Sequence, residues 1–142
     1  MGDGKPHLTA ERLGRVGLFG GLDDETLEAL VERVEVQAYV PGDVIYAQGS
    51  KGRQMYVVLD GTVEMRRGEE LVSEDSVGAW FGEMSVLDMQ PRAVSAVCSE
   101  AALVLVLTCR DLDWLYRRAP KRYSMFVMNM ARQLSRKLRR VI

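Results

Sequence analysis

Residues 81–95 read Phe81-Gly82-Glu83-Met84-Ser85-Val86-Leu87-Asp88-Met89-Gln90-Pro91-Arg92-Ala93-Val94-Ser95. This stretch places a carboxylate, Glu83, and a guanidinium, Arg92, nine positions apart, with a glycine before the carboxylate. Glycine lets backbone N–H groups approach an anion closely, and the planar fork of an arginine fits phosphate oxygens. An ionised glutamate only accepts hydrogen bonds, so it suits hydroxyl groups. The pair predicts a pocket for a small molecule that carries a phosphate and free hydroxyls, which describes a nucleotide.

Apolar and polar residues alternate with a period of two on both sides of this stretch. Val36, Ala38 and Val40 alternate with polar neighbours before the turn at Pro41-Gly42, as in a half-buried strand. Further short strands are expected at residues 44–48, 55–59, 62–66, 71–72, 95–98 and 103–107, with Asp60-Gly61 as a hairpin turn. Short strands separated by glycines predict an antiparallel β-roll or jelly-roll of about eight strands.

Helical periodicity appears at both ends of the chain. Residues 7–18 and 24–34 are expected as helices, the second capped by Asp23. After the strands, residues 111–118 and 121–141 are expected as helices, separated at Ala119-Pro120. The expected class is therefore mainly β with flanking helices (α+β). A single domain, residues 1–142, would hold N-terminal helices (7–34), the β-roll (35–107) and C-terminal helices (108–142).

Composition limits the classes of function. A chain of 142 residues with 47% apolar residues is large enough for one core. It has no long apolar run and no secretion signal at its start, and Cys98 and Cys109 are expected to be reduced thiols, so a cytoplasmic location is expected. His7 is the one histidine, so no zinc site or Cys–His catalytic pair can be assembled. We therefore expect a protein that is not an enzyme and has no cofactor or metal.

Positive charge concentrates at the end of the chain. Residues 110–142 hold ten Lys or Arg and two Asp. The last helix could therefore attract nucleic acid or an anionic membrane. The favoured interpretation is a solvated basic face opposite an apolar stripe formed by Phe126, Met130, Leu134 and Leu138.

On the motif Phe81-Gly82-Glu83, a short helix and then Pro91-Arg92, the chain resembles the cyclic nucleotide-binding domains of the catabolite-activator and protein kinase A regulatory type. The resemblance extends from about residue 18 to the last helix. It implies that Arg92 binds the phosphate and that Glu83 accepts from the ribose 2′-hydroxyl. The remaining candidate ligand-binding residues are Phe81, Gly82, Met84, Ser85, Ala93, Ser95, Val72 and Ser73.

The resemblance also bears on which base is bound. The stretch that corresponds to the family's phosphate-binding cassette is residues 81–95, called the cassette below. In the family a threonine directly after the cassette arginine accompanies cGMP, whereas Ala93 has no hydroxyl. This favours cAMP, with cGMP as the alternative. Ser95 offers a hydroxyl near the phosphate or base, and Val72 and Ser73 are expected to face the purine. At residue 89 a glycine is common in the family, whereas this chain has Met89. It also departs at residues 49–53, where a loop acid is common, and at residue 79, where an Asp is common.

The expected function is that of a cytoplasmic second-messenger sensor in which a cyclic nucleotide moves the C-terminal helices. One alternative is a degenerate module that binds no nucleotide and acts on a protein partner through its basic last helix. Another is the sensing half of a transcription regulator without its DNA-binding domain. The resemblance implies a homodimer through the last helix, and nucleic acid is not an expected partner of this chain alone.

Overall fold

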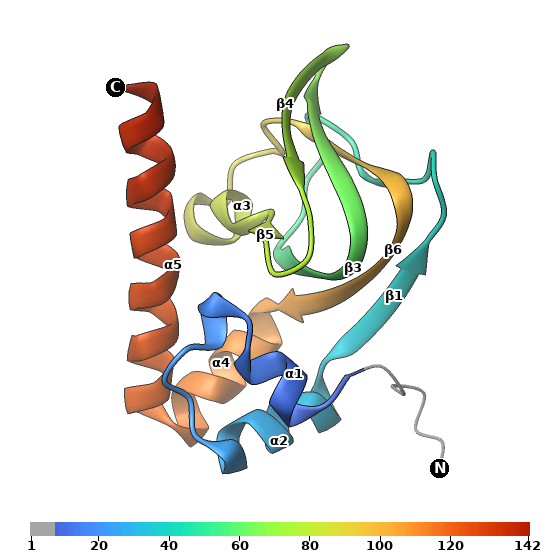
Figure 1. Ribbon diagram of the computed structural model, residues 1–142. Coiled ribbons are helices and arrows are strands. Elements are labelled where there is room, and N and C mark those ends of the chain that lie inside the picture. The colour runs from blue at the N-terminus through green and yellow to red at the C-terminus, as the bar shows by residue number, and fades with distance from the viewer. Residues whose placement is uncertain (1–7) are drawn as a thin grey trace. The chain divides into compact units, whose positions relative to one another are not determined.

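The computed structural model describes residues 8–142, which group into two compact units. A helical unit combines the chain up to residue 33 with residues 110–142, and a sheet unit comprises residues 34–109. The elements of both units are labelled in Figure 1.

The helical unit contains α1 (Ala10–Gly14), the 3₁₀ helix η1 (Gly17–Phe19), α2 (Asp24–Arg33), α4 (Cys109–Arg118) and α5 (Pro120–Val141). The single helix expected at residues 7–18 is wrong. The α-helix α1 ends at Gly14, and the 3₁₀ helix η1 begins at Gly17. The expected start of the helix, His7, lies outside the described residues. Two glycines within four residues weaken a helix interior. The other three helices agree with the prediction to within two residues. Proline opens α5 at its first turn, where its missing N–H has no cost.

Contacts in the helical unit join segments that are far apart in the sequence. The rings of Phe19 and Phe126 lie 5.7 Å apart, and both side chains are buried. The Asn129 amide donates to the carbonyl oxygens of Leu18, at 3.1 Å, and Gly20, at 2.9 Å. α5 therefore closes over the turn that comes after η1.

The sheet unit contains β1 (Glu35–Tyr39), β2 (Val44–Tyr46), β3 (Gln54–Arg67), β4 (Glu70–Asp75), β5 (Trp80–Phe81) and β6 (Ser95–Thr108). The path β1-β6-β3-β4 forms the sheet, β2 also pairs with β6, β5 also pairs with β3, and every pairing is antiparallel. The described residues thus confirm an antiparallel sheet with flanking helices, but they form six strands rather than about eight.

The lower strand count comes from two long strands. β3 runs unbroken through Asp60-Gly61, and β6 joins the two segments expected at residues 95–98 and 103–107. The hairpin predicted at Asp60-Gly61 is therefore wrong. Gly61 has φ +84° and sits among register shifts between β3 and β6, so its left-handed backbone forms a bulge. The turn that does reverse the chain lies at Gly68, between β3 and β4.

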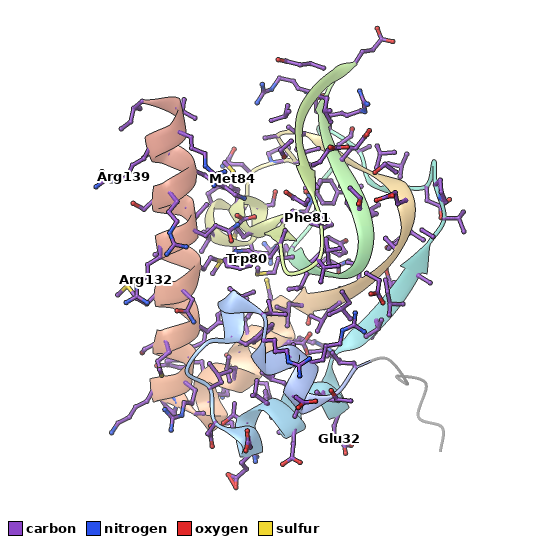
Figure 2. All side chains as sticks on the ribbon, in the orientation of Figure 1. Glu32, Trp80, Phe81, Met84, Arg132 and Arg139 are labelled. Carbon is purple, nitrogen blue, oxygen red and sulfur yellow. The ribbon has the colours of Figure 1, made fainter. Side chains whose placement is uncertain are left out.

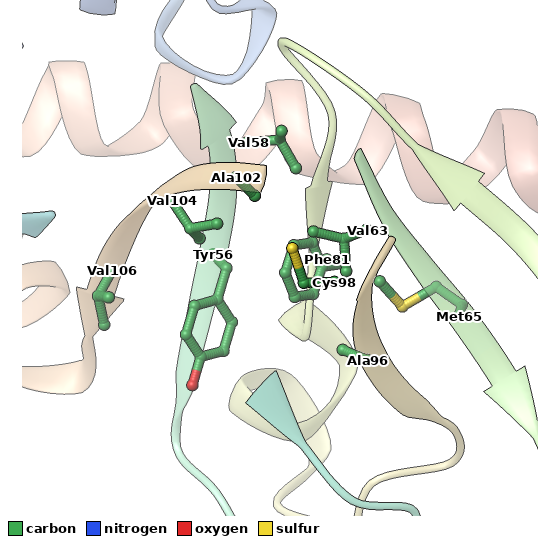
Figure 3. Close-up of a cluster of buried hydrophobic side chains, with 10 residues drawn as sticks. All are labelled: Tyr56, Val58, Val63, Met65, Phe81, Ala96, Cys98, Ala102, Val104 and Val106. Atoms are coloured by element: carbon green, nitrogen blue, oxygen red, sulfur yellow. The ribbon is translucent and has the colours of Figure 1, made fainter. Parts of the chain in front are cut away.

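The core of the sheet unit is a cluster of buried side chains from β3, β5 and β6 (Figure 3). The rings of Tyr56 on β3 and Phe81 on β5 stack with 5.1 Å between their centroids. Around them pack buried residues of β3 and β6: Val58, Val63, Met65, Ala96, Cys98, Ala102, Val104 and Val106. Burying Phe81 here fixes the point at which residues 82–92 leave the sheet.

Of the helices in the described residues, none is long and apolar enough to span a membrane.

Candidate functional site

The cassette begins where the short strand β5 ends. Tyr56 pairs with Phe81 and Val57 with Trp80 in the β3–β5 ladder, and α3 (Glu83–Asp88) comes immediately afterwards. Gly82 lies between them with φ +82°. A Cβ at Gly82 would lie 3.0 Å from Nη1 of Arg92 and 3.3 Å from the carbonyl oxygen of Gln54. Glycine is therefore required both for the backbone turn and for the approach of Arg92.

The Arg92 side chain is buried, with 4% of its surface exposed. Nη1 donates to the carbonyl oxygen of Gly82 at 2.9 Å, and Nη2 donates to that of Gln54 at 2.8 Å. The Tyr46 ring covers one face of the guanidinium, with 4.1 Å between Cζ and the ring centroid. Nε of Arg92 is buried and has no hydrogen-bond partner among the described residues.

The loop before β3 holds the backbone of Arg92. The Arg92 N–H donates to the carbonyl oxygen of Ser50, and the Gly49 N–H donates to the carbonyl oxygen of Arg92, each at 2.8 Å. A Cβ at Gly52 would lie 2.7 Å from Nη2 of Arg92. Residues 49–52 thus wrap around the arginine, and a larger side chain at residue 52 would displace it.

These contacts make Arg92 a suitable site for an anion. The acceptors that hold its guanidinium are neutral carbonyl oxygens, which satisfy donors but do not cancel the charge. Buried charges are normally paired, and a buried donor without a partner is unusual. A phosphate would supply a negative charge at the guanidinium and an acceptor for its remaining N–H groups.

Two further candidate residues, Glu83 and Ser85, are buried in α3.

Burial raises the pKa of the Tyr46 phenol above its ordinary value. The charge of Arg92 opposes this rise, and the charge of Glu83 adds to it. Both charged groups of the cassette therefore act on the same aromatic ring. The structure brings together Phe81, Gly82, Glu83, Ser85 and Arg92.

The remaining candidates lie at the edge of this group or apart from it. Figure 2 labels Phe81 and Met84: Phe81 lies against the sheet, whereas the Met84 side chain on α3 is exposed. Ala93 is exposed, and Ser95 accepts a 2.8 Å hydrogen bond at Oγ from the N–H of Gln48. Val72 and Ser73 are exposed on β4; within residues 8–142, no hydrogen bond links either side chain to the cassette.

Sequence reasoning missed Tyr46, Gly52 and Gln54. Gly52 had a visible signal, because it is the second glycine of the loop that precedes β3. Gln54 takes part through its carbonyl oxygen, which every residue type carries, so its identity held no signal. Tyr46 reads as an ordinary strand aromatic, because its contact with Arg92 crosses 46 positions of sequence.

The family of the chain is established by comparison with known proteins. A family model described as the cyclic nucleotide-binding domain matches residues 36–119, which include the sheet and the whole cassette. The chain belongs to the cyclic nucleotide-binding domain family. It is 34% identical over 127 residues to the cyclic AMP receptor protein of Thermus thermophilus, a match that covers 86% of this chain and 57% of the receptor. It is 30% identical over 90 residues to a cAMP-dependent protein kinase regulatory subunit of Mycosarcoma maydis, covering 61% of this chain and 17% of the subunit.

Solved structures support the same family. The T. thermophilus catabolite activator protein superposes with a TM-score of 0.76 at 32% identity, covering 88% of this chain and 59% of that one. A cyclic nucleotide-binding domain from Methylobacillus flagellatus superposes with a TM-score of 0.80 over 92% of this chain and 76% of that one. At 24% identity the second match shows the shared β-roll fold alone. The chain spans a little over half the length of the T. thermophilus receptor.

Proposed function

We propose that the chain binds a cyclic mononucleotide at the cassette, cAMP in preference to cGMP, as a cytoplasmic sensor. One observation carries the proposal. Arg92 is a buried cation held by two neutral carbonyl oxygens, and its Nε has no partner among the described residues. Arg92 thus holds a positive charge in a fixed position with donors available for an anion.

Each candidate residue has a role in this proposal. Arg92 would bind the phosphate, and Glu83 would accept from the ribose 2′-hydroxyl. The turn at Phe81-Gly82 and the first residues of α3, Met84 and Ser85, would shape the rim around the phosphate. Ala93 and Ser95 would face the ligand after Arg92, while Val72 and Ser73 would meet the purine.

The preference for cAMP has two supports. Ala93 offers no hydroxyl at the position where a threonine accompanies cGMP in the family. The names of the similar proteins from T. thermophilus and M. maydis refer to cAMP. Titration with both nucleotides in parallel tests this preference directly.

The test is calorimetric titration of the nucleotide-free chain with cAMP, cGMP and 2′-deoxy-cAMP. Arg92→Ala should weaken cAMP binding by roughly 30- to 3000-fold, because losing a buried charged partner costs about 2–5 kcal/mol. The deoxy analogue should bind roughly 10- to 100-fold more weakly, as expected for a lost hydrogen bond to a charged group. The matched control is Arg67→Ala, because Arg67 is an exposed arginine of the same unit. This variant should leave the affinities for cAMP and for 2′-deoxy-cAMP unchanged. An unchanged affinity in Arg92→Ala would refute the assignment.

We further propose that the bound nucleotide shifts α4 and α5 between two arrangements. The division of the chain into a sheet unit and a helical unit supports this idea, because compact units can move as bodies. A ligand can drive such a shift only by as much as it prefers one arrangement, a few kcal/mol for a nearly complete change.

A second candidate function is favoured by α5. This helix carries no acidic residue, and Leu138 and Val141 are exposed near its C-terminal end. A module that binds no nucleotide and acts on a protein partner through this helix, or a homodimer formed along it, would account for these features. Absence of heat with every nucleotide, together with a folded chain, would favour this second candidate.

A further inference from the structure

Tyr46 lies against Arg92 in a way that the family motif does not describe. Its ring centroid is 4.1 Å from Cζ of Arg92, which is well within the range of a cation–π contact. The hydrogen bonds to Gly82 and Gln54 hold two edges of the guanidinium in its plane. The ring covers the face of that plane, a direction that neither hydrogen bond restrains.

The backbone of β2 directs Tyr46 toward this position. The pairing of β2 with β6 shifts register between Val44, opposite Val97, and Tyr46, opposite Ala96. A bulge of this kind re-aims the side chain beside it. The Tyr46 ring then packs against Tyr56 and Phe81, with centroid separations of 5.9 and 6.0 Å. Tyr46, the ring under Arg92, is therefore half-buried and packs against the sheet core.

The chemistry of the contact depends on the state of the phenol. Burial raises the pKa of Tyr46 above its ordinary value, so the hydroxyl stays protonated at neutral pH. The attraction to Arg92 therefore comes from the electron-rich ring face and not from a phenolate. Phenylalanine offers the same face, whereas an aliphatic side chain of similar bulk does not.

We propose that Tyr46 is a positioning residue for Arg92, which holds the guanidinium in its anion-binding orientation before the ligand arrives. This inference rests on the proposed function, since it assigns how that site is prepared. A side chain that is already ordered loses less conformational freedom on binding, and this increases affinity.

The experiment compares three variants by calorimetric titration with cAMP. Tyr46→Leu should weaken binding roughly 3- to 30-fold, the loss expected for a desolvated cation–π contact. Tyr46→Phe should remain within about twofold of the parent chain. Tyr39→Leu is the matched control: Tyr39 also packs on this core cluster from β1, but no ring contact joins it to Arg92 within the described chain. It should leave affinity within about twofold of the parent. Equal losses in Tyr46→Leu and Tyr39→Leu would overturn the proposal.

A second readout does not depend on nucleotide. In the free protein, the NMR resonance of the Arg92 Nε–H should carry a ring-current shift from Tyr46 that persists in Tyr46→Phe and disappears in Tyr46→Leu. If the parent chain binds no nucleotide, the proposed function fails, and this resonance still decides whether Tyr46 positions Arg92. If Tyr46→Leu does not fold, Tyr46→Met takes its place, because a flexible thioether fills the same space. An identical Arg92 resonance in all folded variants would overturn the inference.

Discussion

At the scale of single residues, Met89 departs from the glycine that is common in the family, and this departure has an energetic cost. Met89 comes directly after α3 and has φ +57°, and it is the one residue other than glycine with a positive φ among the described residues. A left-handed backbone costs a residue with a Cβ about 1–2 kcal/mol. Glycine, which is common at this point in the family, would adopt the same turn without that cost. The chain keeps the turn and carries the strain.

Met89→Gly should therefore raise the free energy of unfolding by about 0.5–1 kcal/mol, because relief of strain exceeds the entropy that glycine adds to the unfolded chain. The control is Gln90→Gly, at the next residue, whose φ is not positive. This control should lower stability. Urea unfolding of both variants provides the measurement, and a Met89→Gly variant less stable than the parent would contradict the strain argument.

The sequence predicted which charged residues belong to the cassette better than it predicted how they are held. Glu83 and Arg92 were proposed from side-chain type and spacing, and the structure buries both; their roles toward a ligand stay predictions. The partners of Arg92 are two carbonyl oxygens and a ring from another strand. Every residue type carries a backbone carbonyl, so the sequence does not indicate which carbonyl groups bind Arg92. The Tyr46 contact depends on a register shift in β2. Neither could be derived from local pattern.

At the scale of secondary-structure elements, β3 and β6 decide the shape of the sheet. The two strands pair over almost their full length, from Gln54 opposite Thr108 to Arg66 opposite Ser95. The sequence predicted the class of fold and the order of elements, but it divided each long strand into two. An Asp-Gly pair marks a hairpin and a bulge equally well. What distinguishes them here is the pairing of Asp60 and Thr62 with residues of β6.

Gly61→Ala should be strongly destabilising, by roughly 2–4 kcal/mol, since it combines backbone strain with overpacking. A Cβ there would lie 2.1 Å from the carbonyl oxygen of Ala101, and φ is +84°. Gly68→Ala is the matched control: φ is also positive, at +62°, but nothing lies within 4 Å of the added Cβ. It should cost only the backbone term, about 1–2 kcal/mol. Thermal unfolding should therefore rank the parent above Gly68→Ala and Gly68→Ala above Gly61→Ala. Equal effects would show that the contact with Ala101 is relieved by a small backbone shift.

At the scale of the whole molecule, the cassette and the last helix belong to different compact units. Any signal from bound nucleotide must therefore pass from the sheet unit to the helical unit. Within the helical unit, α5 is tied to η1 by Asn129 and by the Phe19–Phe126 contact. Movement of α5 would accordingly carry residues 18–20 with it.

Saturating cAMP should slow amide hydrogen exchange in residues 121–142, because the proposed shift selects one arrangement of α5. The centre of β6 serves as an internal reference, since its amides are already paired on both sides. Arg92→Ala should abolish the effect at the same nucleotide concentration. Exchange in residues 121–142 that does not respond to nucleotide in the parent chain would contradict the coupling, even where binding itself is intact.

The interrupted path of the chain through its two units has a consequence for biosynthesis. Residues 34–109 are continuous, so every residue of the sheet and its cassette has been synthesised before the ribosome adds residues 110–142. α1 and α2 are made before the sheet, but their partners in the same unit are made after it. At about 5–20 residues per second, synthesis of residues 110–142 takes about 2–7 s. Phe19 and the carbonyl groups of Leu18 and Gly20 can contact α5 only once Phe126 and Asn129 have been synthesised. A segment that is translated before the sheet therefore forms these contacts only after the sheet has been translated.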